Sequence, residues 1–243
     1  MKNPLRIAML VSGGGTTMQA IIQACRLGRL WNVEPVCVIA SRRDAGAIEK
    51  ALALKMRRED VLIRKPKNYL DSEAFGEAII AACQARGVDF IGQYGWMVKT
   101  PSNVIEAYKG MMVNQHPGPL DPGRPDFGGE GMFGRRVHCA RLYFVRTVKR
   151  DFWTAATAQR VAVEYDKGAL LKTHTVPILE DDDTASLQER VLPHEHQLQI
   201  EVLDDFAKGR LREFVREAPL VLPGEEAIIE QAKRIAKALF PKG

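Results

Sequence analysis

The fold of this chain is decided by RIAMLVSGGGTT at residues 6–17, an apolar run that ends in three glycines. A continuous apolar run of this length is typical of a parallel strand that is buried on both faces. Thr16 and Thr17 follow the glycines and can cap a helix that continues to about Arg29. The segment therefore predicts a strand, a tight turn and a helix.

The same alternation of apolar runs and amphipathic stretches continues along the chain. It predicts strands at 36–40, 61–63, 89–92, 111–113, 160–163 and 169–172, and helices at 45–54, 71–86, 184–207 and 225–239. Strands that alternate with helices indicate a parallel sheet with helices on its faces. We expect an α/β protein with a Rossmann-like, doubly wound, mostly parallel sheet.

Residues 117–150 break this pattern, because they are rich in proline and glycine and then in arginine. Such an irregular stretch within a compact domain is usually functional or mobile. We treat residues 118–155 as an insert with two possible roles. It forms either a lid whose cations attract anionic ligands, or a surface excursion that packs on itself.

Composition narrows the class of protein. Hydrophobic residues make up 46% and charged residues 27% of the 243, which is ordinary for a soluble globular protein. We expect no membrane span and no secretory signal. The four cysteines form no CxxC pair, which favours the reduced cytoplasm and no structural zinc. The net charge of +5 is compatible with phosphate-bearing ligands or RNA, but a mildly basic soluble enzyme explains it as well.

The tripeptide Asn114-Gln115-His116 ends a predicted strand, where ligands gather in sheets of this kind. Asparagine can donate an N–H to a developing oxyanion, and histidine can move a proton. An aspartate would orient that histidine, and Asp166 is a candidate, although its turn-like sequence Tyr-Asp-Lys-Gly fits a purely structural residue equally. The remaining histidines lack the spacing of metal ligands, so no metal is predicted.

Two further features stay open on the residues alone. The glycines at 13–15 can cradle a phosphate or simply form a tight turn. They match neither a Walker A loop nor the dinucleotide-binding pattern GxGxxG. Asp183 is the expected N-cap of the helix at 184–207, on which Glu195 is one acidic residue among several charges.

The chain resembles the folate-dependent formyltransferases from Arg6 to about Leu211, and most closely those that act on glycinamide ribonucleotide. Four segments carry the resemblance: Ser12–Gly15 with Gln19-Ala20, Asn114–Pro117, Asp166–Gly168, and Asp183-Thr184 through Glu195-His196. The Asn-His-Asp set is shared with formyltransferases that act on sugars and on methionyl-tRNA, and with formyltetrahydrofolate hydrolases. It therefore indicates formyl chemistry and leaves the acceptor open.

The resemblance implies a role for each matching residue. Catalysis would fall to Asn114, His116 and Asp166. The acceptor's phosphate would lie on Gly15, Thr16 and Thr17, and its ribose on Glu195. The co-substrate 10-formyltetrahydrofolate would lie against Trp96, Met97, Val98, Lys99, Ala162, Val163, Glu164 and Tyr165.

The chain also departs from the family. Met97 replaces a common arginine, Gln159 replaces a common histidine, and the helix from Glu225 is additional. We expect a formyltransferase domain over residues 1–211 and a C-terminal extension over 212–243 with an amphipathic helix. The expected partners are small-molecule substrates, with no membrane or nucleic acid, in a monomer or homodimer. A sugar-amine formyltransferase, a hydrolase, and a non-catalytic RNA- or folate-binding protein remain as alternatives.

Overall fold

The computed structural model describes residues 3–241 and 243 of the chain. Met1, Lys2 and Lys242, which belong to the expected domain and its extension, lie outside the described residues. The chain divides into two compact units. Unit 1 comprises the residues up to Asn114 together with Gln199–Leu211, and unit 2 comprises Gln115–Leu198 together with Arg212–Gly243. Each unit is described by itself below.

Unit 1 is a series of βα repeats. Its elements are β1 (Leu5–Val11), α1 (Thr16–Arg26), β2 (Val33–Ala40), α2 (Gly46–Ala53), β3 (Val61–Ile63), α3 (Ser72–Gln84), β4 (Phe90–Gln93), α4 (Ser102–Ala107) and β5 (Met112–His116), whose last two residues belong to unit 2. The pairs β2–β3, β1–β2, β1–β4 and β4–β5 are all parallel. Each strand predicted before residue 114 is confirmed.

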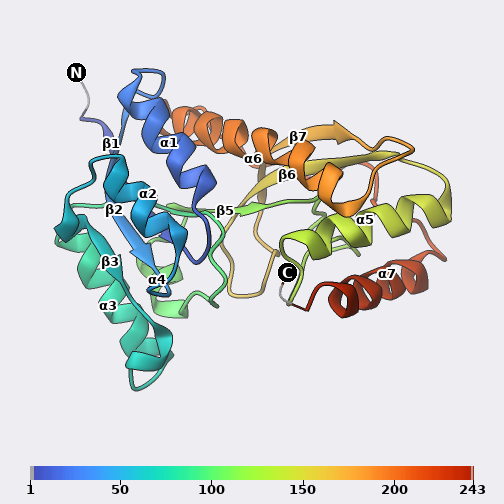
Figure 1. Cartoon of the computed structure of the whole chain (residues 1–243), viewed down its shortest axis with the longest axis horizontal. Coiled ribbons are helices and arrows are strands. Elements are labelled where there is room, and N and C mark those ends of the chain that lie inside the picture. The colour runs from blue at the N-terminus through green and yellow to red at the C-terminus, as the bar shows by residue number, and fades with distance from the viewer. Residues whose placement is uncertain (1–2, 242) are drawn as a thin grey trace. The chain divides into compact units, whose positions relative to one another are not determined.

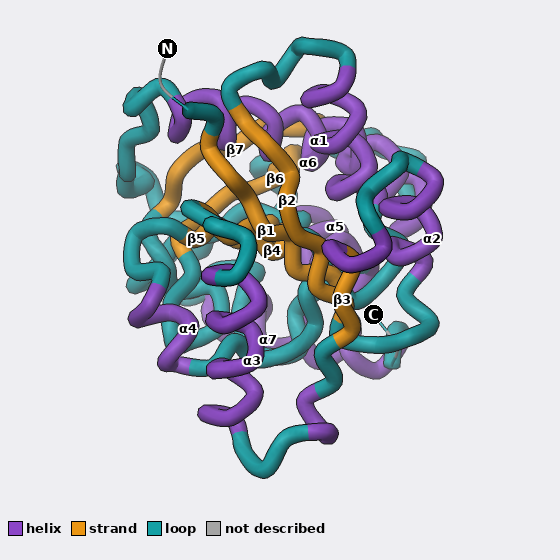
Figure 2. The backbone as a smooth tube through the Cα atoms, turned by 90° about the vertical axis from the view of Figure 1, so that its left-hand side faces the viewer, coloured by secondary structure: helices purple, strands orange, loops and turns teal. Residues whose placement is uncertain are grey.

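Strands β1, β2 and β4 form the core of unit 1, because most of their side chains are buried on both faces. Residues Ile7 to Val11 of β1 are completely buried. Helices α1 and α2 cover one face of the strands, and α3 and α4 cover the other (Figure 2). The side chain of Asp71 caps α3 by accepting a hydrogen bond of 2.8 Å from the N–H of Ala74. This layering is the doubly wound arrangement that the sequence predicts.

Unit 2 contains α5 (Arg135–Val148), β6 (Trp153–Arg160), β7 (Leu170–Pro177), α7 (Glu226–Leu239) and the first part of α6 (Thr184–Ala207). Strands β6 and β7 pair antiparallel. The order of the seven strands is β3-β2-β1-β4-β5-β6-β7, so the predicted Rossmann-like, mostly parallel sheet is confirmed. Asp183 caps α6 as expected, because it accepts hydrogen bonds of 2.8 Å from the N–H groups of Ala185 and Ser186.

Two predictions in unit 2 are wrong. The strand expected at 160–163 lies earlier, because β6 ends at Arg160 and the next residues form a loop. The stretch at 135–148 is not irregular but is helix α5, which packs against α7 (Figure 1). The helical pattern was not recognised in the sequence because many arginines interrupt its apolar face, which includes the buried Val137 and Phe144. Within the described residues, no helix is long and apolar enough to cross a membrane.

Candidate functional site

The glycine loop between β1 and α1 lies very close to the backbone of α2. Gly15 has a φ of 67°, and a Cβ at this position would lie only 2.5 Å from the Cβ of Ala47. Glycine is therefore required here by both conformation and space. No side chain caps α1, so the predicted capping by Thr16 and Thr17 is wrong. The N–H groups of this first turn have no intrahelical acceptor and can meet an anion.

The loop is held by contacts from two sides within unit 1. The ammonium of Lys50 donates a hydrogen bond of 2.7 Å to the carbonyl of Gly14. The hydroxyl of Ser12 accepts a hydrogen bond of 2.9 Å from the N–H of Met97. The structure thus brings the expected phosphate loop together with the expected folate segment at 96–99. In that segment Trp96 is buried and stacks on Phe75, whereas the side chain of Met97 is half exposed.

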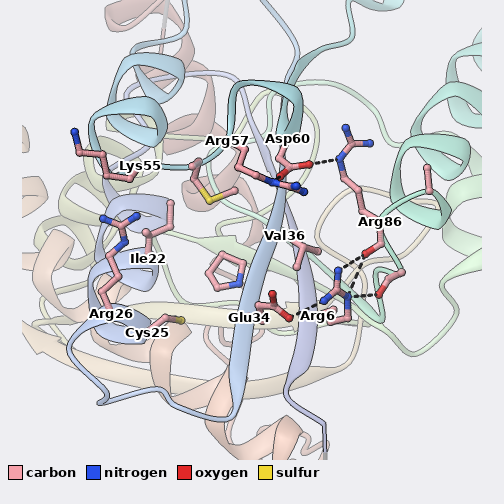
Figure 3. Close-up of a pocket in the computed structure, with 14 residues that line it drawn as sticks. Arg6, Ile22, Cys25, Arg26, Glu34, Val36, Lys55, Arg57, Asp60 and Arg86 are labelled. Carbon is pink, nitrogen blue, oxygen red and sulfur yellow. Dashed lines mark hydrogen bonds and ion pairs between the residues drawn. The ribbon is translucent and has the colours of Figure 1, made fainter.

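A pocket of about 640 Å³ lies elsewhere in unit 1, at the amino ends of β1 and β2 (Figure 3). Arg6 and Glu34 form an ion pair in its wall, and Arg86 binds Asp60 there. Arg6 is at the opposite end of β1 from the glycine loop. None of the predicted site residues lines this pocket.

His116 ends β5 and is only 2% exposed. Its Nδ1 lies 3.6 Å from Oδ2 of Asp166. Its buried Nε2 has no hydrogen-bond partner among the described residues. Asn114 precedes His116 by two residues on the same strand. Of the two ring nitrogens of His116, one therefore lies beside a carboxylate, and the other makes no hydrogen bond with the described part of the chain.

Asp166 lies in the loop between β6 and β7 and has a φ of 56°. Its Oδ1 accepts a hydrogen bond of 2.7 Å from Nε2 of Gln159, and its Oδ2 accepts one of 2.9 Å from the N–H of Gly129. A carboxylate that is hydrogen-bonded on both oxygens has a fixed orientation. The proximity of Asp166 to His116, which sequence spacing leaves open, is thus found in the structure.

Glu195 on α6 is 7% exposed, so it is not the surface residue that its sequence context suggests. Burial raises the pKa of its carboxyl to about 7, although a hydrogen bond with the side chain of Gln115 opposes this shift. Since Gln115 precedes His116 directly, Glu195 lies in the same part of unit 2. A carboxyl of this kind can accept hydrogen bonds from hydroxyl groups of a ligand.

Sequence reasoning missed three residues around His116. Gln115 and Gly129 contact Glu195 and Asp166, respectively. His138 on α5 is 1% exposed, and burial together with the nearby His116 lowers the pKa of its imidazole to about 3, so that it stays neutral. No local pattern marks His138, because the helix that carries it was not predicted.

The remaining predicted positions belong to loops. Ala162, Val163, Glu164 and Tyr165 lie between β6 and β7, just before Asp166, and the side chains of Val163 and Tyr165 are exposed. Among the residues that the structure describes, no three His, Cys, Asp or Glu side chains gather as metal ligands would.

The fold and the buried histidine beside a carboxylate define a Rossmann-like α/β protein with groups suited to proton transfer. The profile of the formyl transferase family matches residues 5–203. The chain therefore belongs to the formyl transferase family.

Known relatives agree with this assignment. The chain is 28% identical to phosphoribosylglycinamide formyltransferase from Arabidopsis thaliana chloroplasts over 85% of this chain and 67% of that one. It is equally similar, at 28%, to the Haemophilus influenzae protein of that name, over 85% and 89% of the two chains. The crystal structure of glycinamide ribonucleotide transformylase 1 from Symbiobacterium toebii superposes with a TM-score of 0.75 at 29% identity, over 88% and 96% of the chains.

Proposed function

We propose that this chain transfers a formyl group from 10-formyltetrahydrofolate to the amine of glycinamide ribonucleotide, a step of purine biosynthesis. The observation that carries this proposal is the buried His116, whose Nε2 is free among the described residues and whose Nδ1 lies 3.6 Å from Asp166. Family membership and the names of the relatives support the choice of donor and acceptor.

In the net reaction one C–N bond forms, one C–N bond breaks, and one proton passes from the amine to the folate nitrogen through the side chains of the site. The lone pair of the acceptor amine attacks the formyl carbon, and the bond from that carbon to the folate nitrogen then breaks. The N–H donor of Asn114 stabilises the oxyanion that forms in between. His116 delivers a proton to the leaving nitrogen, and Asp166 orients the imidazole and helps to accept the proton that the amine loses.

The substrates would bind at the positions that the resemblance implies. The acceptor's phosphate would meet the N–H groups of Gly15, Thr16 and Thr17, with the charge of Lys50 nearby. Its ribose hydroxyls would donate to Glu195. The pterin would lie against the segments 96–99 and 162–165, largely through their backbone.

A formyl-transfer assay with a panel of acceptors tests this proposal. The acceptors are glycinamide ribonucleotide, a sugar amine and a blank with water alone. Transfer to the ribonucleotide with little release of formate in the blank is the expected result. Preferential transfer to the sugar amine, or rapid formate release in the blank, would instead assign one of the alternative activities.

We also propose that the enzyme acts in the cytoplasm on small-molecule substrates, as a monomer or homodimer. The four cysteines are unpaired in the structure, which supports a reducing compartment. A non-catalytic RNA-binding role finds little support in unit 2, because several arginines of the insert are used internally. Arg136 and Arg146 donate to backbone carbonyls, and Arg141 is completely buried.

A further inference from the structure

The C-terminal segment, defined here as Arg212–Gly243, lies beyond the residues that the family profile matches. Its first part is hydrogen-bonded to the loop that follows His116. The guanidinium of Arg216 donates a hydrogen bond of 3.0 Å to the carbonyl of Leu120. In return, Arg124 donates one of 2.7 Å to the carbonyl of Arg216. This first anchor joins the C-terminal segment to the beginning of the insert.

The second anchor is the guanidinium of Arg136 at the start of α5. It donates hydrogen bonds of 2.7 and 2.8 Å to the carbonyls of Phe240 and Pro241, and a third of 2.8 Å to the carbonyl of Gly131. The guanidinium also lies 4.6 Å from the centre of the Phe133 ring. A planar fork of donors can bind three carbonyls at once, which a lysine cannot do with the same geometry. Arg136 thus connects the end of the chain directly to the loop.

The same loop reaches the carboxylate of Asp166. Gly129 donates its N–H to Oδ2 of Asp166 at 2.9 Å. A Cβ at the preceding Gly128 would lie 2.7 Å from the Cβ of Asp166, so the loop passes as closely as a backbone can. Gly129 and Gly131 are two residues apart, and both have a positive φ, at 103° and 77°. A short glycine-rich segment holds its place only where other groups fix it.

From these contacts we propose that Arg136 is a positioning residue for the reaction. It joins the C-terminal segment to the 128–131 loop, and this loop holds the carboxylate of Asp166 in the orientation that faces His116. The inference rests on the proposed function of Asp166. It gives the C-terminal segment a role in catalysis, although none of its residues needs to touch the substrate.

The test compares Arg136→Gln with Arg135→Gln, which removes the same charge from the neighbouring residue. Arg135 is exposed and makes a hydrogen bond of 3.2 Å to Gln188 instead. We expect Arg136→Gln to lower kcat about tenfold, the effect of losing the one hydrogen bond from Gly129 to the charged Asp166. KM should change by less than about twofold. Arg136→Lys should fail to restore the rate, and Arg135→Gln should leave kcat unchanged.

A second measurement reads the histidine directly. Because the carboxylate selects which ring nitrogen of His116 carries the proton, the ¹⁵N shifts of the imidazole should change in Arg136→Gln and not in Arg135→Gln. This measurement is made on the substrate-free protein. It therefore tests the positioning role even if the wild-type chain forms no formylated product, a result that would overturn the proposed function alone.

A shortened chain that ends at Leu239 provides an independent variant, since it lacks the carbonyls of Phe240 and Pro241. If Arg136 acts through them, the shortening and Arg136→Gln should each have the same effect and should not add. Unchanged ¹⁵N shifts in both variants would overturn the inference, even if both lost stability. Additive losses of kcat would also overturn it, because the two changes would then act separately.

Discussion

The βα repeats before Asn114 and the insert after His116 are held together by different kinds of contact. In the repeats, the strands pair through their backbones, as β1 does with both β2 and β4, and α1 packs on α2. In the insert, Arg141 donates to the carbonyls of Asp151 and Trp153, and Arg136 reaches Phe240. The first region is therefore held by strand pairing and helix packing, whereas the second depends on arginines that bind backbone carbonyls, both within the insert and in the C-terminal part of the chain.

Removal of the Arg141 side chain is the most stringent test of this difference between the two regions. This side chain is completely buried, and its guanidinium lies 4.9 and 4.8 Å from the rings of Phe127 and Trp153. Burial lowers the pKa of Arg141 to about 9, so it stays charged at neutral pH. We expect Arg141→Ala to lower the free energy of unfolding by about 3–5 kcal/mol, because it opens a cavity and strands two carbonyls.

Denaturant unfolding measures this loss. Asp71→Ala serves as the comparison from unit 1, where it removes a helix cap and should cost only about 1 kcal/mol. Equal losses in the two variants would show that the buried guanidinium stabilises the insert no more than a single helix cap stabilises the repeats.

The same difference explains how far the sequence could be read. Residues 6–17 encode a strand and a turn within one short window, so β1 and its glycine loop were predictable. Helix α5 was not, because its apolar face is interleaved with arginines that find carbonyl partners far along the chain. Asn114, His116 and Asp166 were recognisable by residue type, but only the fold places Asp166 beside His116.

The catalytic residues provide the second test. Asn114→Ala should lower kcat by about a hundredfold to a thousandfold, which is the usual cost of one oxyanion donor. His116→Ala should be at least as severe, and the double variant should lose little more, since residues that act as a unit fail together. Circular dichroism should show an intact fold. Near-native turnover in either single variant would refute the assigned roles.

Glu195 offers a third test through pH. The pKa of its carboxyl is about 7 in the folded chain, against an ordinary value of 4.5. Between these values the unfolded chain releases the proton while the folded chain keeps it, so the stability contributed by this group is full below pH 4.5 and is lost as the pH rises to about 7. The shift corresponds to about 3 kcal/mol. Glu195→Gln should remove this part of the pH dependence.

The experiment compares the free energy of unfolding of the wild type and Glu195→Gln at pH 5 and pH 8. The free energy of unfolding of the variant, relative to that of the wild type, should increase as the pH rises. Glu189→Gln is the matched control, since Glu189 is an exposed carboxylate on the same helix. A constant difference between wild type and Glu195→Gln across this range would mean that Glu195 ionises normally in the folded chain.

The smallest expected effect concerns the glycine loop and asks whether a locally encoded turn also binds a ligand. Gly15→Ala forces a side chain into a left-handed backbone against Ala47, at a cost of about 1–2 kcal/mol. Gly13→Ala is the matched control, because a Cβ there would meet nothing within 4 Å. If the loop binds phosphate, Gly15→Ala should raise KM for the phosphorylated acceptor by up to about tenfold and leave KM for the folate nearly unchanged.

If the turn has only a structural role, Gly15→Ala should instead raise KM for both substrates to the same extent. Gly13→Ala should leave both constants near the wild-type values, and added phosphate should compete with the acceptor less strongly in Gly15→Ala than in either of the other two proteins.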